Sequence, residues 1–374
     1  MGLAASFATS TSSSIKVVRT IENAAAQVRN PCAALVFLSG TVGEKLEEVA
    51  SAVADRKLGF PVLFGTGAGV LHERGELEGQ SAAAGLVWSG VGARALVLHT
   101  SHGDLASALD RALSEHRARS AFLLVRPDRL EPGLFADVSL KDRVVFGAGT
   151  ATSEDVVVTD GRGGIDRGPV GALLVETPPI LGVTRASRLI TPLRPITRIS
   201  GSMILEIDGE DALDVLSAAG QQLGGQPLIF VALANDDQPE SGATSRSPEV
   251  VLRPIQGVDP TRRGIVVGDN VEESTLAAFA IRDAPAARED LESMTRELLR
   301  HSAGAAPRFG VYVNCAGRGR SLYSATNVDT RLIRSRLGDV PLVGLQSAFE
   351  LAPYAGGLAL HLYTGVLALF TSPS

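Results

Sequence analysis

The sequence predicts an α/β fold in which helices cover mixed sheets, because two kinds of pattern alternate along the chain. Apolar residues recur three or four positions apart in 104–117, 209–223 and 283–304, as in amphipathic helices. Between them lie short apolar runs typical of buried strands. These runs are AALVFLS, ALVLH, AFLLV, GALLVE, LIFVAL and RGIVVG. We also expect a β-hairpin that turns at Asp160-Gly161, since Asp-Gly favours a tight turn.

Composition narrows the classes of function. The 374 residues predict about two domains. A net charge of −6 does not favour a nucleic-acid partner, because phosphate binding needs a basic face. No apolar run reaches the ~18 residues of a membrane span, so we expect no membrane partner. Two cysteines form no disulfide framework, which favours a cytoplasmic location. The six histidines have no metal-ligand spacing, and we expect no structural metal.

The domain organisation follows from shifts in composition. Residues 1–19 are rich in Ser and Thr, and we expect a flexible tail. We place a first α/β domain at 20–224 and a second at 225–374, with the boundary after the helix that ends in QQLGGQP. Within the second domain, 235–249 has almost no apolar residues and is expected to be a mobile loop.

The two halves of the chain contain the same order of predicted elements. Each half has a strand, a helix that ends in Leu-Gly, a strand opened by a proline (Pro61 or Pro341), a turn and another apolar strand. This order predicts two related halves that arose as a pseudo-duplication. The alternative is that strand–helix–strand units are common and look alike. The second copy is the more polar one: Gln346, Ser347 and Glu350 stand where GTGAG fills the turn of the first.

The residues carry a resemblance to a known family. The N-terminal pieces are FPVLFGTGAGVLHERGELEG and PITRISGSMILEIDGEDAL. The C-terminal pieces are VVLRPIQGVDPTRRGIVVGDNV, NCAGRGR, DVPLVGLQSAFELAPYAGG and LHLYTGVLALF. In this order they resemble a FIST protein, with an N-terminal FIST domain followed by a C-terminal one, over nearly the whole chain after residue 19. The sequence departs from the family pattern at Thr66, where a cysteine is common, and at Ala348 and Phe349.

The resemblance implies a sensory, ligand-binding protein rather than an enzyme. Small molecules such as amino acids are proposed as ligands of the family, and many members are joined to signalling output modules. We therefore expect an amino-acid-like or carboxylate ligand and a separate signalling partner. Other members are haem proteins that sense nitric oxide, so a haem-bound sensor is an alternative. A Cys-His hydrolase and an interaction scaffold are further alternatives.

Candidate site residues cluster near the C-terminus, at the ends of two strands that we expect to be neighbours, where open α/β sheets bind ligands. Gly317 and Gly319 permit a left-handed backbone that could form an anion-binding nest, and Arg318 and Arg320 could hold a carboxylate. The alternative is a polar turn with two solvated arginines.

The remaining candidates have similar double interpretations. Glu350 could hold a ligand ammonium, while Gln346 and Ser347 could supply neutral hydrogen bonds. Cys315 is either a buried thiol or a ligand contact, and with His361 and Glu350 it could form a Cys-His-acid set. His361 shares a strand face with Tyr363 and is either a half-buried histidine, a ligand contact or a haem ligand. We expect no catalytic residue, no metal and no resident cofactor other than a possible haem at His361.

Overall fold

The computed structural model describes residues 2–371 except 100–103, 131–133, 136–137, 139, 153, 225–226, 236–248, 269–270, 274 and 303. The chain divides into two compact units. Unit 1 contains Met1–Thr184, Leu291–Leu360 and Thr364–Ser374, and unit 2 contains Arg185–Asp290 and His361–Tyr363. Helices and mixed sheets confirm the predicted α/β class. The compact units do not follow the expected division, because the boundary at 224/225 lies inside unit 2.

Unit 1 holds three sheets, each with six strands. The first has the order β1 (Ala4–Ser10), β6 (Ala82–Trp88), β2 (Ala33–Ser39), β3 (Val62–Gly67), β10 (Val156–Thr159), β11 (Ile165–Gly168). The second has the order β7 (Ala93–Val97), β12 (Val170–Val175), β8 (Ser120–Val125), β9 (Val144–Gly149), β24 (Glu350–Tyr354), β25 (Gly357–His361). The third has the order β13 (Ile180–Arg185), β26 (Thr364–Thr371), β22 (Pro307–Cys315), β23 (Leu342–Ser347), β4 (Gly69–His72), β5 (Gly75–Glu78).

The three sheets share one plan. At the centre of each, two strands run parallel, as β2 with β3, β8 with β9 and β22 with β23. The first strand of each pair is flanked by an antiparallel strand, which is β6, β12 or β26. The same order of elements therefore recurs three times along the chain. We call these segments repeat 1 (4–88), repeat 2 (93–175) and repeat 3 (180–371), and unit 2 is inserted in repeat 3.

The β-hairpin that follows the second parallel strand of each repeat pairs with the sheet of another repeat. The β4–β5 hairpin of repeat 1 adds to β23 of repeat 3, and β10–β11 of repeat 2 adds to β3 of repeat 1. The exchange closes when β24–β25 of repeat 3 adds to β9 of repeat 2. No repeat completes its own sheet, so strands from the C-terminal part of the chain fold together with the N-terminal half. This is why the units cut across the expected consecutive domains.

The sequence comparison found repeats 1 and 3 and missed repeat 2. The strands after Pro61 and Pro341, β3 and β23, have the same neighbours in the same directions, as the pseudo-duplication requires. A third copy lies between them, so the two-part description is incomplete. VVFGAG of β9 resembles VLFGTG of β3 in composition, but Phe146 faces the shared core and Phe64 faces the helices, so this match does not mark equivalent positions.

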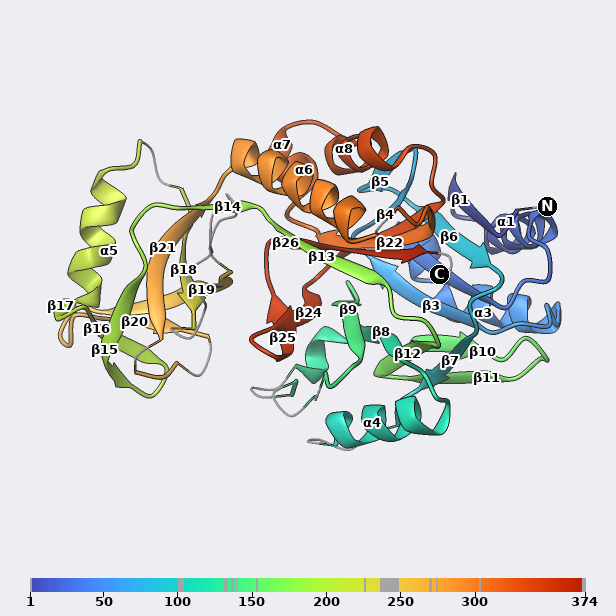
Figure 1. Cartoon of the computed structure of the whole chain (residues 1–374), viewed down its shortest axis with the longest axis horizontal. Coiled ribbons are helices and arrows are strands. Elements are labelled where there is room, and N and C mark those ends of the chain that lie inside the picture. The colour runs from blue at the N-terminus through green and yellow to red at the C-terminus, as the bar shows by residue number, and fades with distance from the viewer. Residues whose placement is uncertain are drawn as a thin grey trace. The chain divides into compact units, whose positions relative to one another are not determined.

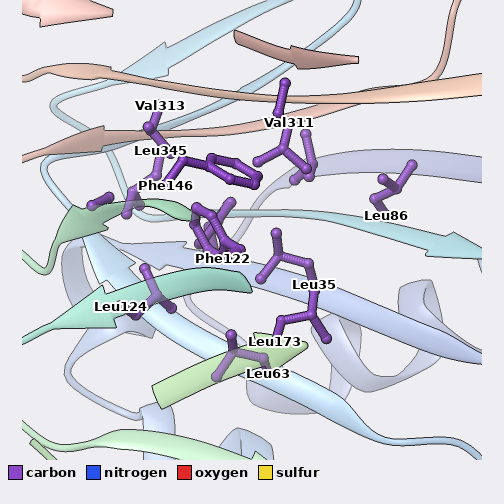
Figure 2. Close-up of a cluster of buried hydrophobic side chains, with 14 of the residues drawn as sticks. Leu35, Leu63, Leu86, Phe122, Leu124, Phe146, Leu173, Val311, Val313 and Leu345 are labelled. Carbon is purple, nitrogen blue, oxygen red and sulfur yellow. The ribbon is translucent and has the colours of Figure 1, made fainter. Parts of the chain in front are cut away.

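Helices cover the outer faces of the sheets, and the inner faces form one core. The described helices of unit 1 are α1 (Ser14–Gln27), α2 (Gly40–Gly43), α3 (Leu46–Asp55), α4 (Leu105–Glu115), η1 (Pro127–Arg129), α7 (Arg320–Tyr323), α8 (Val328–Leu337) and the part of α6 (Ala284–His301) that follows Asp290. Figure 1 shows α4 beside β7 and β12, and α6 and α8 along the β22–β26 sheet. Figure 2 shows side chains from all three repeats meeting in the shared core, among them Leu35, Phe122 and Val311. Within the described residues, no helix is both long and apolar enough to cross a membrane.

The expected flexible tail at 1–19 is wrong. Residues Ala4–Ser10 form β1, which pairs with β6 from Ala4–Trp88 to Ser10–Ala82. Ser13 then caps α1 by accepting a hydrogen bond from the Lys16 amide. The segment is ordered because Phe7 packs against the strand at Gly85, where a β-carbon would stand 2.4 Å from the Phe7 ring.

The described residues of unit 2 form an antiparallel barrel with helix α5 (Ala212–Gln221) and the first residues of α6. The strands are β14 (Ser187–Leu189), β15 (Arg194–Ser200), β16 (Met203–Ile207), β17 (Glu210–Asp211), β18 (Ile229–Ala234), β19 (Val251–Asp259), β20 (Gly264–Val267) and β21 (Leu276–Arg282). The barrel runs β21–β15–β16–β20–β19–β18 and closes because β18 pairs with β21. Apart from its two end residues, the predicted mobile loop at 235–249 lies outside the described residues.

Candidate functional site

A buried carboxylate lies where the parallel strands of repeat 3 end. Glu350 opens β24 and is 0% exposed. The Ser347 hydroxyl is 2.8 Å from Glu350 Oε1, and the Thr364 hydroxyl and amide donate to Oε2 at 2.6 and 3.2 Å. We call Ser347, Glu350 and Thr364 the Glu350 centre. It occupies the carboxyl end of the β22–β23 pair, the edge at which α/β sheets commonly bind ligands.

The electrostatics of this carboxyl are unusual. Burial raises the pKa of Glu350 to about 8, although hydrogen bonds from Thr364 and Ser347 and the charge of Arg318 act to lower it. Among the described residues, Glu350 has hydrogen bonds only from neutral donors and no ion pair. A buried charge is costly without a cation, so at neutral pH the carboxyl is mostly protonated.

The repeats provide an internal comparison for Glu350. In each repeat, the first strand of the exchanged hairpin pairs with the second parallel strand of another repeat. The equivalents of Glu350 are the hairpin residues that pair with the matching core-facing residue of that strand. The pairs are Val70 with Leu345 in repeat 1, Val156 with Gly65 in repeat 2, from the register that pairs Val157 with Phe64, and Glu350 with Ala148 in repeat 3. Val70 and Val156 are at most 1% exposed and belong to the shared core. The fold therefore accepts valine twice where repeat 3 has a carboxylate.

The residues around Glu350 differ from repeat 1 in the same way. At the ends of β2, β3 and at the start of β6, repeat 1 has Ser39, Gly67 and Ala82, which are mutual register partners. Repeat 3 has Cys315, Ser347 and Thr364 in these places, from Cys315–Ser347 pairing and the register next to Asn314–Gly365. The backbone plan does not require these polar groups, because repeat 1 folds the same way with smaller or less polar ones.

A second polar network lies on the helix-covered side of the same strands. The Arg318 guanidinium has no exposed side-chain surface, and its Nε is 2.7 Å from Asp329 Oδ2. Asp329 also accepts hydrogen bonds from Tyr312, Tyr323 and Asn314, at 2.7, 2.8 and 3.1 Å. Burial acts to raise the pKa of Asp329, but Arg318 and these donors outweigh it and the pKa is lowered. Arg318 thus has an internal carboxylate partner, with which a ligand carboxylate would have to compete.

The predicted anion-binding nest is not formed. Gly319 has φ −56° and ψ −127°, and Gly317 is not among the glycines with positive φ, so the expected left-handed backbone is wrong. The Arg320 amide donates to the Glu78 carboxylate at 2.9 Å. A β-carbon on Gly319 would stand 2.1 Å from Glu78 Oε1. The close approach of Glu78, rather than positive φ, explains the glycine.

The other predicted residues are divided between the units. Cys315 is buried at the end of β22, as the register partner of Ser347. The Gln346 amide is buried, and its Nε2 has no hydrogen-bond partner among the described residues. His361 and Tyr363 belong to unit 2, where His361 is 1% exposed and Tyr363 packs on Phe230 with ring centroids 4.5 Å apart. Of the predicted residues, Ser347 and Glu350 are joined by a hydrogen bond between their side chains.

Sequence reasoning missed the partners that define both networks. Thr364, Asn314 and Asp329 were not predicted as site residues. Thr364 is the first residue of β26 and directly follows the polar Tyr363, and Asp329 is an acid in the first turn of α8. In the described part of the chain, no group of three or more His, Cys, Asp and Glu side chains could hold a metal ion.

Family models match most of the chain. The FIST N domain matches residues 32–210, and the FIST C domain matches residues 211–353. The chain belongs to the FIST family. FIST domains form a sensory family. In this FIST protein the boundary between the two models, at 210/211, lies inside unit 2 at the start of α5. The model boundary differs from the compact units for the same reason as the expected one, since the repeats exchange strands.

Similar proteins extend the family without naming a ligand. An uncharacterized protein of Mycobacterium tuberculosis is 28% identical over 319 residues, which is 81% of each chain. An uncharacterized protein of Mycobacterium bovis is 29% identical over 213 residues, covering 54% of this FIST protein and 53% of the relative. Among solved structures, T. maritima PurL complexed with ATP aligns with 98% of this chain and 72% of its own, at 11% identity and a TM-score of 0.23.

Proposed function

We propose that this FIST protein senses a small molecule that binds at the Glu350 centre and that it signals through a separate protein. The observation that carries the proposal is the comparison of Glu350 with Val70 and Val156. A core position that two repeats fill with valine holds a carboxylate in the third. Departures of this kind from a fold's own pattern concentrate at functional sites.

The cost of keeping Glu350 supports a role other than stability. Burial of an ionisable carboxyl with neutral donors only is unfavourable compared with a packed valine. Where repeat 1 has Gly67 and Ala82, repeat 3 has Ser347 and Thr364, and both bond to the glutamate. Ligand sites commonly combine a few convergent polar groups with apolar surroundings.

We place the ligand at Glu350 rather than at Arg318, because the Arg318 guanidinium already has Asp329 within 2.7 Å. This changes the expected recognition chemistry. A carboxylate-bearing metabolite would need to displace Asp329 from Arg318. Glu350 has only neutral hydrogen-bond donors among the described residues, so a cationic ligand group could pair with it without displacing another charge.

A thermal-shift screen against amino acids, amines, nucleotides and haem tests the proposal. A ligand that binds only the folded state raises the melting temperature, by an amount equivalent to about 2.7 kcal/mol at one hundred times Kd. Glu350→Val, which copies repeats 1 and 2, should fold and lose the response. Arg320→Ala, at an exposed side chain, is the matched control and should keep it. A ligand that stabilises wild type and Glu350→Val equally would place the site elsewhere.

A further inference from the structure

The Ser347 hydroxyl has two acceptors and one proton. Its Oγ lies 2.8 Å from Glu350 Oε1 and 3.0 Å from the Asn314 carbonyl oxygen. A carbonyl can only accept, and an ionised carboxylate can only accept, whereas a protonated carboxyl can donate. Both short contacts are therefore full hydrogen bonds only if Glu350 carries a proton. The order is then Glu350 Oε1–H to Ser347 Oγ, and Ser347 Oγ–H to the Asn314 carbonyl.

The second carboxyl oxygen fixes where this proton sits. Oε2 accepts hydrogen bonds from both the hydroxyl and the amide of Thr364, so the proton belongs on Oε1. The strand opposite, β9, presents Ala148 and brings no charge. The Arg318 guanidinium exerts a field on Glu350 but is bonded to Asp329. The geometry thus holds Glu350 as a neutral acid inside a chain of hydrogen bonds.

Resting on the proposed function, we propose that the ligand carries a primary ammonium group and that it binds by exchanging this cation for the proton of Glu350. The Oε1–H bond breaks and the proton passes to the solvent buffer. The Ser347 hydroxyl turns from the Asn314 carbonyl and donates to the carboxylate. The ammonium supplies the cation that the buried carboxylate lacks. One positive charge enters for each proton released, so the net charge of the site is unchanged.

Neutral, anionic and ammonium ligands differ in whether their binding releases the proton of Glu350. A neutral ligand leaves Glu350 protonated and releases no proton. An anionic ligand gains nothing from a site whose acid can only ionise to the same sign of charge. The buried carboxylate favours the binding of an ammonium ligand, because a charge-assisted hydrogen bond replaces a neutral one. Glu350 is then the residue that determines specificity.

The test uses the full chain and a set of primary amines from methylammonium to 1,4-diaminobutane, with alcohols of equal length as neutral controls. Binding is followed by calorimetry in phosphate and in HEPES, two buffers that differ in heat of protonation and contain no primary amine. At pH 6 to 7 we expect close to one proton released per bound amine, falling toward none at pH 9. As the pH is raised toward 8, the affinity for the amine should increase by up to about tenfold per pH unit. The alcohols should not bind.

Glu350→Gln keeps the shape of the side chain and cannot ionise. It should lose amine binding and show no proton release, and a protonated-carboxyl infrared band of the wild type should be absent from it. Failure of every amine at pH 9, amine binding without proton release at pH 6, or equal amine binding by Glu350→Gln would each overturn the inference. If a neutral or anionic compound stabilises the wild type and not Glu350→Val, only the ammonium class is wrong. If no compound distinguishes these two proteins, the proposed function fails as well.

Discussion

Glu350 occupies in repeat 3 the core position that Val70 occupies in repeat 1. Glu350 is the first residue of β24 and Val70 the second residue of β4, and each pairs with a core-facing residue of a neighbouring repeat, Ala148 or Leu345. Val70 is packed in apolar surroundings, whereas Glu350 is surrounded by Ser347 and Thr364. Because the backbone plan is the same, the two positions allow the effect of the carboxylate to be separated from the effect of the fold.

Restoring the residues of repeat 1 should stabilise the protein. We expect the combined variant Glu350→Val, Ser347→Gly, Thr364→Ala to exceed the wild type in free energy of unfolding by about 1–3 kcal/mol at pH 8, since a buried polar group is replaced by an apolar one. The reciprocal change, Val70→Glu, places a carboxylate without its two hydroxyl partners and should cost about 3 kcal/mol or more. Urea unfolding measures both, and a combined variant less stable than wild type at pH 8 would contradict the comparison.

Stability should fall as pH rises. The folded-state pKa of Glu350 is raised to about 8 by burial, and that of Glu76 to about 7 by burial and by repulsion from Asp329, both from 4.5. In this range the folded state binds more protons than the unfolded state, so the stabilisation present below pH 4.5 is lost through pH 7–8. For each group, every pH unit between its unfolded and folded pKa lowers the free energy of unfolding by at most about 1.4 kcal/mol. Glu350→Gln should flatten the profile most between pH 7 and 8, and Glu76→Gln below pH 7. Chemical unfolding from pH 5 to 9 measures this, and a Glu350→Gln profile parallel to wild type would remove Glu350 from the account.

The two arginines of NCAGRGR should behave differently. Arg318→Ala leaves Asp329 buried without its cation and should lower the free energy of unfolding by about 3–5 kcal/mol. Arg320→Ala changes an exposed side chain and should stay within about 0.5 kcal/mol of the wild type. Denaturant unfolding at pH 7 compares them. Equal stability of the two variants would mean that the Arg318–Asp329 pair is not the structural element described here.

Unit 1 should fold without unit 2. The inserted segment leaves and re-enters at neighbouring points, since the Arg185 amide donates to the Asp290 carboxylate at 2.6 Å. We expect a protein in which a short Gly/Ser linker replaces residues 186–289 to unfold cooperatively. The fragment 1–224 lacks β22, β23 and β26 and should not, because β4–β5 and the shared core then lose their partners. Circular dichroism during heating distinguishes the two, and a cooperatively folding 1–224 would contradict the strand exchange.

Local patterns predicted much of the fold. The helices at 105–115, 212–221 and 284–301 and the hairpin at Asp160-Gly161 follow from periodicity and turn chemistry, which depend on neighbouring residues only. The strand exchange did not follow, because pairing of β4 with β23 joins residues more than 270 positions apart and leaves no local trace. The N-terminal strand was missed because its Ser and Thr residues are equally typical of a tail.

The candidate site was predicted in part for the same reason. Ser347 and Glu350 are close in the sequence, and their contact follows from a short turn. Asp329 and Thr364 bond to Arg318 and Glu350 only because α8 and β26 return to the ends of β22 and β23. Two arginines beside glycines indicated a ligand nest, but burial decides whether an arginine meets a ligand or an internal acid, and burial depends on the tertiary fold.

The central claim is that a ligand binds at Glu350. The most direct measurement is isothermal titration of the compound that gives the largest thermal shift, into wild type and into Glu350→Val at pH 8. We expect saturable binding at one site in the wild type and at least a hundredfold weaker binding in Glu350→Val, with the folded state of the variant intact by circular dichroism. Equal affinity for the two proteins would contradict it.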